Sequence, residues 1–244
     1  MRSQMADGGV QIAEPGDSRF SGRRVPMLVT GLVMLAAAWL VPWSAVFPGP
    51  FAAHMTRHVG VVAIAAPCLA LAIAGSRFDP SRHWPVLFGP IVASLSELIV
   101  IWGWHAPALH HAARSAAPVF ALEQGSFLVT GLVVWLAAFG GRTEDRAARS
   151  ATGVVVLLFT LMHMTLLGAL LGLSPRPLYV HNAVAPANVL ADQHLGAAIM
   201  LTVTAVSYLA GGLWLSHRLI AHRARTVSSR DDPPATGVLP ATGH

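Results

Sequence analysis

Six long apolar runs constrain the fold of this sequence more than any other feature. A helix needs about 20 apolar residues to cross a bilayer. The runs that approach or exceed this length are 25–47, 52–74, 86–104, 118–139, 153–173 and 195–217. Proline and glycine separate neighbouring runs, as in Pro48-Gly49-Pro50 and Gly140-Gly141, and both residues are typical of turns. The sequence therefore predicts an all-α fold, a polytopic membrane helical bundle of about six transmembrane helices.

The composition also indicates a membrane protein. Apolar residues make up 54% of the chain and charged residues only 11%, whereas soluble domains carry about a quarter charged residues. A net charge of +5 can indicate nucleic-acid binding. Here the basic residues lie in short loops between apolar runs, so we expect no nucleic-acid partner. The single cysteine, Cys68, lies within an apolar run, which excludes a disulfide framework and a CxxC metal site.

The distribution of arginine predicts the orientation in the membrane. All sixteen basic residues are arginine, and six spans place both termini on one side. That side carries every arginine except Arg114 and Arg176, which lie on the other side, and Arg57, which lies within the second span. Positive residues favour the cytoplasmic side, so we expect both termini in the cytoplasm. The polar segments 1–24 and 219–244 are expected to be disordered there, flanking one transmembrane domain over 25–218.

Ionisable residues at membrane depth gather in the extracytoplasmic half. His54 and His58 are four residues apart in the second span, so both lie on one helical face. This spacing suits two imidazoles that bind one metal ion. The other members of this set are Glu97, Glu123, His163, Asp192 and His194. Ionisable groups in a membrane are costly and often functional, although a histidine pair near a helix end can also be merely interfacial.

The surroundings of these histidines point to copper. Met55 lies between His54 and His58, and two further methionines flank His163. Imidazole together with thioether ligands favours copper, particularly Cu(I). Arg57 is expected to pair with one of the acidic residues. The pair His110 and His111 is interpreted as part of a loop.

Five motifs in a fixed order resemble a known family. They are HMTRHVGVVAIAAPCLALA, WGWHAPALHHAA, ALEQGSFLVTGLVVW, LLGALLGLSPRPLYV and LADQHLGAAIM. Together they resemble the CtaG family of bacterial cytochrome c oxidase assembly factors, the polytopic kind associated with caa-type oxidases, over about residues 30–220. The resemblance implies a bacterial inner-membrane protein that helps to build a haem-copper oxidase. The positions that match the family motifs are His54, His58, His105, Glu123 and Asp192 with Gln193.

Two positions depart from the family pattern. The fourth-span motif usually reads Glu-His but is Glu123-Gln124 here, and the sixth-span motif usually reads Asp-Gln-Gln but ends in His194 here. Glutamine cannot replace imidazole as a strong ligand of a soft metal. His163 or His194 is therefore expected to supply the missing imidazole.

The leading hypothesis is a copper-binding assembly factor that is not an enzyme. The expected ligands are His54 and His58, with His105, His163 or His194 completing the site. Charge balance and orientation of the imidazoles are assigned to Met55, Arg57, Glu97, Glu123, Asp192 and Gln193. The expected partners are a membrane subunit of a haem-copper oxidase, the lipid bilayer and a periplasmic copper donor. The alternatives are a b-type haem protein, a metal transporter and a metal-free assembly scaffold.

Overall fold

The computed structural model describes residues 17–47, 49–141, 146–179 and 186–231, and within them the chain is helical with no strand. The α-helices are α1 (Asp17–Leu40), α2 (Trp43–Val46), α3 (Pro50–Val59), α4 (Ala66–Ile73), α5 (Pro90–His105), α6 (Pro107–Ser115), α7 (Ala117–Phe139), α8 (Arg146–Gly172) and α9 (Pro186–Asp231). A π-helical turn, η1 (Gly60–Ala65), joins α3 to α4, and a 3₁₀ turn, η2 (Pro80–Arg82), precedes α5.

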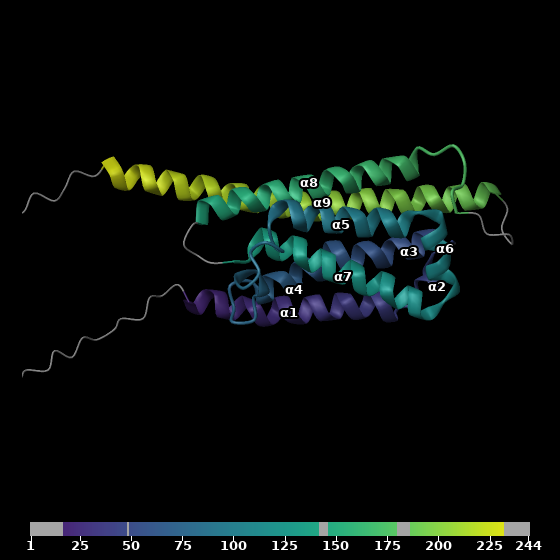
Figure 1. Cartoon of the computed structure of the whole chain (residues 1–244), viewed down its shortest axis with the longest axis horizontal. Coiled ribbons are helices and arrows are strands. Elements are labelled where there is room, and N and C mark those ends of the chain that lie inside the picture. The colour runs from purple at the N-terminus through teal and green to yellow at the C-terminus, as the bar shows by residue number, and fades with distance from the viewer. Residues whose placement is uncertain (1–16, 48, 142–145, 180–185, 232–244) are drawn as a thin grey trace, which may run out of the picture.

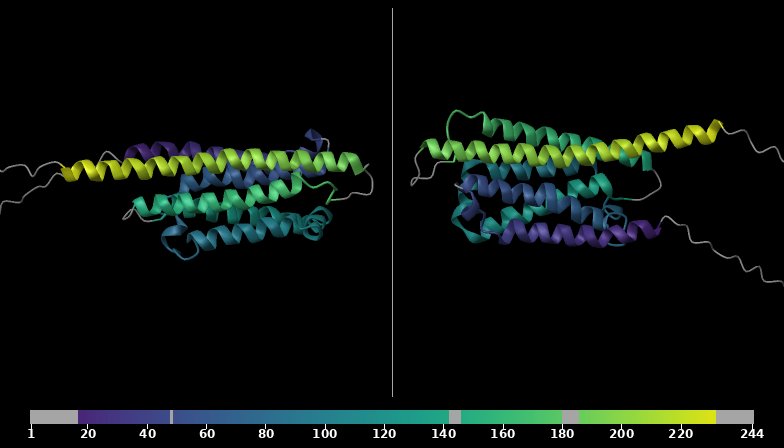
Figure 2. Two further views of the ribbon diagram at one scale, coloured as in Figure 1. Left: turned by 90° about the horizontal axis from the view of Figure 1, so that it is seen from above. Right: turned by 180° about the vertical axis from the view of Figure 1, so that it is seen from behind.

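The long helices lie side by side along one axis (Figure 1). The start of α1 and the end of α9 lie at the same end of the bundle, whereas α2 and α6 lie at the opposite end (Figure 1). Helix α9 packs against both α8 and α3, and α1 packs against α4. Two further views show that α9 runs the whole length of the bundle and extends beyond it at the end where α1 begins (Figure 2).

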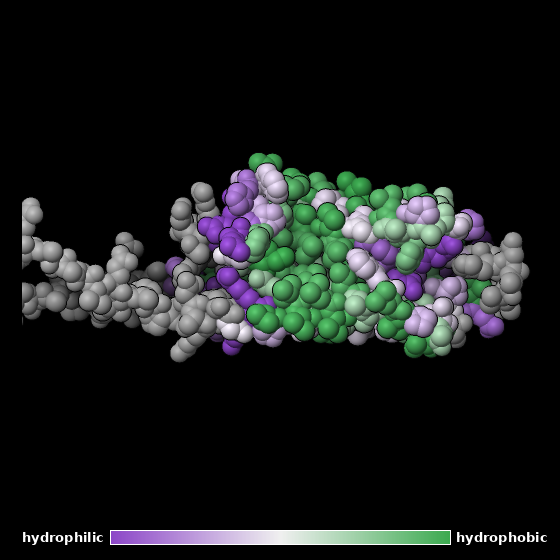
Figure 3. All heavy atoms as spheres, turned by 90° about the horizontal axis from the view of Figure 1, so that it is seen from below, coloured by the Kyte–Doolittle hydropathy of each residue, from purple (hydrophilic) through white to green (hydrophobic). Residues whose placement is uncertain are grey.

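The described helices confirm a polytopic membrane bundle. Five are long and apolar enough to cross a bilayer: Gly22–Leu40, Pro50–Ile73, Ala117–Phe139, Ala147–Gly172 and Asn188–Ala224. Large apolar side chains on their outer faces are exposed, as expected for contact with lipid. On the face drawn in Figure 3 they form a broad hydrophobic belt between two hydrophilic ends.

The third expected span is a broken one. Helix α5 has 16 residues and is therefore about 24 Å long, which is less than the hydrocarbon thickness of about 30 Å. Helix α6 follows at an angle of 73°, and the two together make a sixth span if they are counted as one. The break falls at Ala106, which has extended backbone angles (φ −65°, ψ 131°). Such angles are expected before a proline, because Pro107 disfavours the α conformation of the preceding residue.

Two helices extend into segments that we expected to be disordered. Helix α1 already begins at Asp17, and α9 continues to Asp231. Between 218 and 226 the chain is rich in arginine and alanine and has no glycine or proline, so nothing in it stops a helix. The remaining parts of those segments, 1–16 and 232–244, lie outside the described residues.

The π-helical turn η1 begins two residues after His58 and has a cause in the sequence. Pro67 has no backbone N–H, so the chain cannot continue the regular α-helical hydrogen bonds through this position. The Ala66 N–H instead donates to the carbonyl of Val61, five residues earlier. Such wide turns within α-helices are rare and frequently lie at functional sites.

Two side chains satisfy the carbonyl groups that this turn exposes. The Val62 carbonyl accepts a hydrogen bond from Trp135 Nε1 of α7 at 2.9 Å. The Ala63 carbonyl accepts one from Ser207 Oγ of α9 at 2.6 Å. Buried carbonyl groups without a partner are costly, so these bonds stabilise the turn and fix α3 and α4 against two neighbouring helices.

Candidate functional site

Four histidines meet at the end of the bundle opposite the start of α1 and the end of α9. His54 and His58 lie on one face of α3, His105 ends α5, and His110 lies on α6. All four are buried, with exposed fractions of 0 to 4%. The ring centroids of His54 and His110 are 4.8 Å apart, and those of His58 and His105 are 5.4 Å apart. We call these four residues the histidine cluster.

The protonation of His105 follows from its hydrogen bond. Its Nδ1 lies 2.6 Å from the carbonyl oxygen of Ile101. A carbonyl oxygen only accepts, so Nδ1 carries the proton and Nε2 has the free lone pair. Nε2 is buried and has no hydrogen-bond partner among the described residues. A metal-binding histidine is commonly held in this way, with its other nitrogen donating to a backbone carbonyl.

A buried carboxylate and an arginine complete this end of the bundle. Glu123, in the second turn of α7, accepts a hydrogen bond from the Arg114 guanidinium through Oε2. Arg114 also lies 3.2 Å from Nδ1 of His54. Because arginine is always a donor, that nitrogen accepts and His54 carries its proton on Nε2. The His54–Glu123 separation is 3.9 Å between Nδ1 and Oε2.

The donor atoms in this region fit a metal ion. Nitrogen or oxygen atoms of His54, His110 and Glu123 all lie within 4.8 Å of one another. Several buried atoms nearby have no hydrogen-bond partner in the described part of the chain: both nitrogens of His58, His105 Nε2 and Glu123 Oε1. Buried polar atoms are normally paired, and a bound ion would satisfy such a set. Imidazole and carboxylate together suit first-row transition metals.

His110 and Arg114 were missed as site residues in the sequence. Our interpretation of His110 as a loop residue is wrong, because it lies on α6 and is 3% exposed. The break at Pro107 turns α6 across the end of the bundle, which places His110 against His54. Its neighbour His111 is exposed, as expected. The four-residue spacing of His110 and Arg114, which puts both on one helical face, is the signal that could have found them.

Gln124 orients the carboxylate rather than replacing an imidazole. Its Nε2 donates to Glu123 Oε2 at 3.1 Å, and its side chain is buried. The fourth imidazole of the region comes from His110 instead. The departure from the usual Glu-His pair therefore leaves a histidine-rich site in place.

Met55 packs against α9, and Arg57 bonds to a carbonyl group of α1 rather than to a carboxylate. Met55 is buried and packs closely against Gly196 of α9. A Cβ added to that glycine would lie 3.0 Å from the Met55 Cγ. Arg57 donates from Nε to the carbonyl of Ala38 at 3.2 Å, and its guanidinium lies 5.4 Å from the centroid of the Phe120 ring. Arg57 thus links α1, α3 and α7, and the ion pair with an acidic residue is made by Arg114.

The remaining predicted residues lie outside the histidine cluster. His163 faces Glu97, with 3.9 Å between Nε2 and Oε2. His194 is exposed, and its Nε2 lies 3.1 Å from the carbonyl oxygen of Ser174. Gln193 accepts from the Leu178 N–H at 2.8 Å and donates to the Leu171 carbonyl at 3.0 Å. The structure brings neither His163 nor His194 to the cluster.

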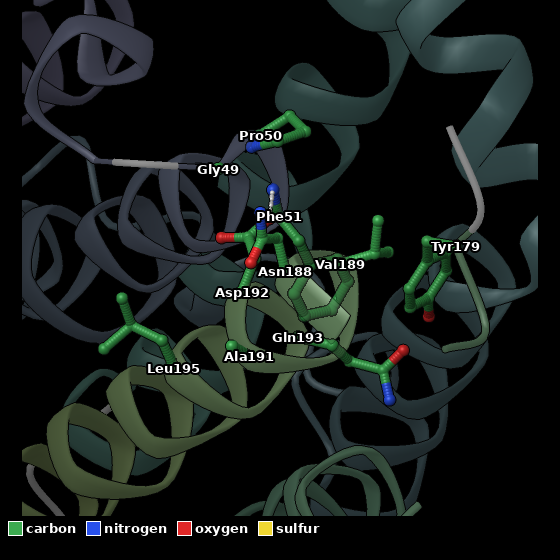
Figure 4. Close-up of a pocket in the computed structure, with 10 residues that line it drawn as sticks. All are labelled: Gly49, Pro50, Phe51, Tyr179, Asn188, Val189, Ala191, Asp192, Gln193 and Leu195. Atoms are coloured by element: carbon green, nitrogen blue, oxygen red, sulfur yellow. Dashed lines mark hydrogen bonds between the residues drawn. The ribbon is translucent and has the colours of Figure 1, made fainter. Parts of the chain in front are cut away.

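Asp192 caps the helix that carries His54 and His58. Its carboxylate accepts hydrogen bonds from the N–H group of Phe51 at 2.8 Å (Figure 4) and from that of Ala52 at 3.0 Å. These groups have no partner within α3, because the first turn of a helix leaves its N–H groups free. A carboxylate at this position also interacts favourably with the helix dipole. Asp192, on α9, therefore fixes the start of α3.

A cavity of about 450 Å³ opens beside this cap and is lined by Phe51, Tyr179, Asp192 and residues at the start of α9 (Figure 4). The Phe51 and Tyr179 rings stack at 4.6 Å between centroids. The His110 ring contacts both, at 5.7 Å and 4.5 Å. The Tyr179 hydroxyl donates to the carbonyl of His105 at 2.7 Å. Burial raises the pKa of Tyr179 above its usual range, so the hydroxyl remains a donor. Two aromatic rings thus separate the cavity from the histidine cluster.

Comparison with known proteins identifies the family. The family model of the cytochrome c oxidase caa3 assembly factor (Caa3_CtaG) matches residues 8–222. The chain belongs to this family. No curated protein and no solved structure matches the chain. Membership of Caa3_CtaG confirms the resemblance seen in the sequence and places the chain among assembly factors rather than in a class of enzymes. Together with its apolar helices, it indicates a multi-pass membrane protein that takes part in cytochrome c oxidase assembly.

Proposed function

We propose that this Caa3_CtaG member binds copper at the histidine cluster and helps to deliver it to the catalytic subunit of the oxidase. The observation that carries this proposal is the convergence of four buried imidazoles and the Glu123 carboxylate from α3, α5, α6 and α7. Several of their donor atoms have no other partner among the described residues. Assembling so many polar groups inside an apolar bundle is costly unless they bind something.

Copper is favoured by the imidazoles and by the family. Imidazole suits zinc, copper, iron and nickel, and a haem-copper oxidase requires copper in its catalytic subunit. The thioether ligands that the sequence suggested give less support, because Met55 lies against α9. Either oxidation state of copper accepts histidine ligands, so the site does not require a sulfur donor.

The proposed site faces the extracytoplasmic side. The histidine cluster lies at the end of the bundle away from the start of α1 and the end of α9 (Figure 1). The arginine-rich loops join the helices at the opposite end of the bundle, and such loops favour the cytoplasm. The orientation proposed is therefore both termini inside, in the bacterial cell membrane. A periplasmic copper donor would then approach the end that carries the cavity beside Phe51 and Tyr179.

The b-type haem alternative is less well supported by the arrangement of the histidines. It needs His58 opposite His163 or His194 across a haem. The His58 ring instead packs against the rings of His105 and Phe127, at 5.4 Å and 4.3 Å between centroids. His194 is exposed at the surface. An absorption spectrum of the purified protein without a Soret band would remove this alternative.

Metal analysis of the purified protein tests the proposal. The wild type loaded with Cu⁺ is compared with His54→Ala/His58→Ala and with His111→Ala, an exposed histidine of α6 that serves as the matched control. We expect the double variant to lose the copper bound at the cluster and His111→Ala to keep it. Unchanged copper in the double variant contradicts the proposal. In cells, the double variant should also lower oxidase activity, whereas a metal-free scaffold would leave that activity intact.

A further inference from the structure

A second group of buried polar side chains lies deeper in the bundle. Glu97 on α5, His163 on α8 and Tyr208 on α9 have exposed fractions of 0%, 2% and 1%. The Tyr208 hydroxyl donates to Glu97 Oε1 at 3.1 Å, and His163 Nε2 lies 3.9 Å from Glu97 Oε2. Glu97 precedes His105 by eight residues, so it lies about 12 Å further along α5. This group is therefore separate from the histidine cluster.

The two buried glutamates differ in how their charge is balanced. Glu123 is paired with the Arg114 guanidinium. The ionisable side chain that faces Glu97 in the described part of the chain is His163, and the two are too far apart for a direct hydrogen bond. Glu97 Oε2 and both ring nitrogens of His163 have no hydrogen-bond partner among the described residues. A carboxylate in the interior of a membrane protein takes up a proton unless a cation or a set of donors balances its charge. A metal ion beside Oε2 would supply that balance.

We propose that Glu97 and His163 form a second metal-binding site, which takes a divalent first-row transition metal ion. Such ions bind histidine nitrogen at about 2.0–2.1 Å and carboxylate oxygen at about 2.0–2.2 Å. The 3.9 Å between the two donor atoms exceeds the separation of about 3.4 Å that tetrahedral bonds of this length require, so a small side-chain rotation brings both atoms to the ion. Nitrogen and oxygen donors without sulfur suit ions of intermediate hardness, such as Zn²⁺, better than Cu(I).

Tyr208 orients the Glu97 carboxyl group in this site. Its hydroxyl holds Oε1 of Glu97 and so turns Oε2 towards His163. Ligating carboxylates are commonly oriented by such hydrogen bonds, and their loss typically weakens metal binding by about 10–100-fold. Thr160, fully buried and three residues before His163 on the same face of α8, borders the site. Its hydroxyl lies close enough to Glu97 to interact with the carboxyl group.

Metal stoichiometry of the full chain in detergent tests the second site. We expect the metal-stripped wild type to bind two equivalents of Zn²⁺, and Glu97→Gln/His163→Gln to bind one. His54→Ala/His58→Ala should lose the other equivalent, and the combined variant should bind none. Thr204→Val is the matched control, because Thr204 is a buried polar residue of α9 that bonds only to carbonyl groups of its own helix. It should bind as the wild type does.

The two sites can fail separately. If Glu97→Gln/His163→Gln binds as much Zn²⁺ as the wild type, the second site is refuted, whatever happens at the cluster. If the only equivalent bound by the wild type is lost in that variant and retained in His54→Ala/His58→Ala, the second site stands and the function proposed for the cluster does not.

If a double variant does not fold, a milder substitution and a spectroscopic measurement still test the second site. Tyr208→Phe keeps both ligands and should weaken Zn²⁺ binding at this site by about 10–100-fold. Cu²⁺ bound to His54→Ala/His58→Ala should show coupling to nitrogen in its electron paramagnetic resonance spectrum, and His163→Gln in the same background should remove it. Unchanged affinity in Tyr208→Phe together with an unchanged spectrum in His163→Gln would overturn the proposal.

Discussion

Arg114 donates a hydrogen bond to Glu123 from a position where its guanidinium also lies 3.2 Å from Nδ1 of His54. The metal ion proposed for this end of the bundle would need the same carboxylate and the same imidazole. Arginine and metal therefore compete for two of the donor groups, and the positive charge of the guanidinium repels the ion. If the protein delivers copper as proposed, this competition is useful because it limits the affinity of the site.

Replacing Arg114 by glutamine should strengthen copper binding. Glutamine can still donate to Glu123 but carries no charge. Two positive charges about 4 Å apart repel each other by about 4 kcal/mol near a protein surface, and about 1.4 kcal/mol already corresponds to a tenfold change in affinity. We expect Arg114→Gln to bind Cu⁺ at least about tenfold more tightly, as measured by competition with a chelator of known affinity.

Arg57→Gln provides the control for this change. Arg57 and Arg114 both lie over the Phe120 ring, at 5.4 Å and 5.2 Å from its centroid, but Arg57 donates to the carbonyl of Ala38 instead of to Glu123. Its loss should change copper affinity much less. Weaker binding by Arg114→Gln would show that the arginine supports the site rather than competing with the metal.

Removing the Asp192 carboxylate should destabilise the start of α3. Loss of a helix-capping side chain costs about 0.5–2 kcal/mol, so Asp192→Ala should lower the thermal unfolding temperature and reduce copper binding at His54. His194→Ala is a suitable control, because His194 is exposed two residues further along α9. Equal unfolding temperatures for the two variants would contradict a capping role.

Gly49 should be sensitive to substitution for the same reason. A Cβ at Gly49 would overlap the carboxylate of Asp192, so a side chain here requires the carboxylate or the backbone to move. Gly49→Ala is therefore expected to disturb the cap as Asp192→Ala does. The two substitutions combined should cost little more than either alone, because each removes the same pair of hydrogen bonds.

Ser207 should contribute to stability through the π-helical turn. Ser207→Ala leaves the Ala63 carbonyl without its hydrogen bond from α9, at a cost of about 1–3 kcal/mol for an unsatisfied buried group. The half-buried Ser96 bonds to the carbonyl of Ala93 in its own helix, so Ser96→Ala should cost less. Unfolding in denaturant compares the two, and an equal loss would argue against a special role of the Ser207 bond.

Two adjacent glycines of α9 should respond differently to alanine. A Cβ at Gly211 would lie 2.8 Å from the Trp135 ring and 2.9 Å from Leu157, whereas a Cβ at Gly212 would meet nothing within 4 Å. Gly211→Ala should therefore lower the unfolding temperature. Gly212→Ala should be neutral or stabilising, because alanine favours a helix over glycine by about 0.5–1 kcal/mol. The opposite order would contradict the close approach of Gly211 to Trp135 and Leu157.

The sequence was sufficient for the bundle and for part of the site. Apolar length alone predicts the long helices, and the four-residue spacing predicts that His54 and His58 share a face. Neither can reveal that α6 folds back by 73° after Ala106, so His110 was assigned to a loop. Copper and the orientation in the membrane remain predictions.

Contacts between distant helices account for most of the remaining differences. Glu123 pairs with Arg114 rather than Arg57 because α6 lies across the start of α7. Asp192 was expected to balance charge, but its role depends on the position of the first turn of α3, 140 residues earlier. Hydrophobic periodicity within one span carries no information on such pairings.

The cap on α3 also determines when, during synthesis, the helix that carries His54 and His58 becomes fixed. His54 and His58 leave the ribosome early, but Asp192, which fixes the helix that carries them, is made about 140 residues later. Until α9 has entered the membrane, the N-terminus of α3 lacks the carboxylate that holds it. An unfinished chain therefore has its histidines before the helix that carries them is capped, and the site proposed for copper is completed only once α9 is in place.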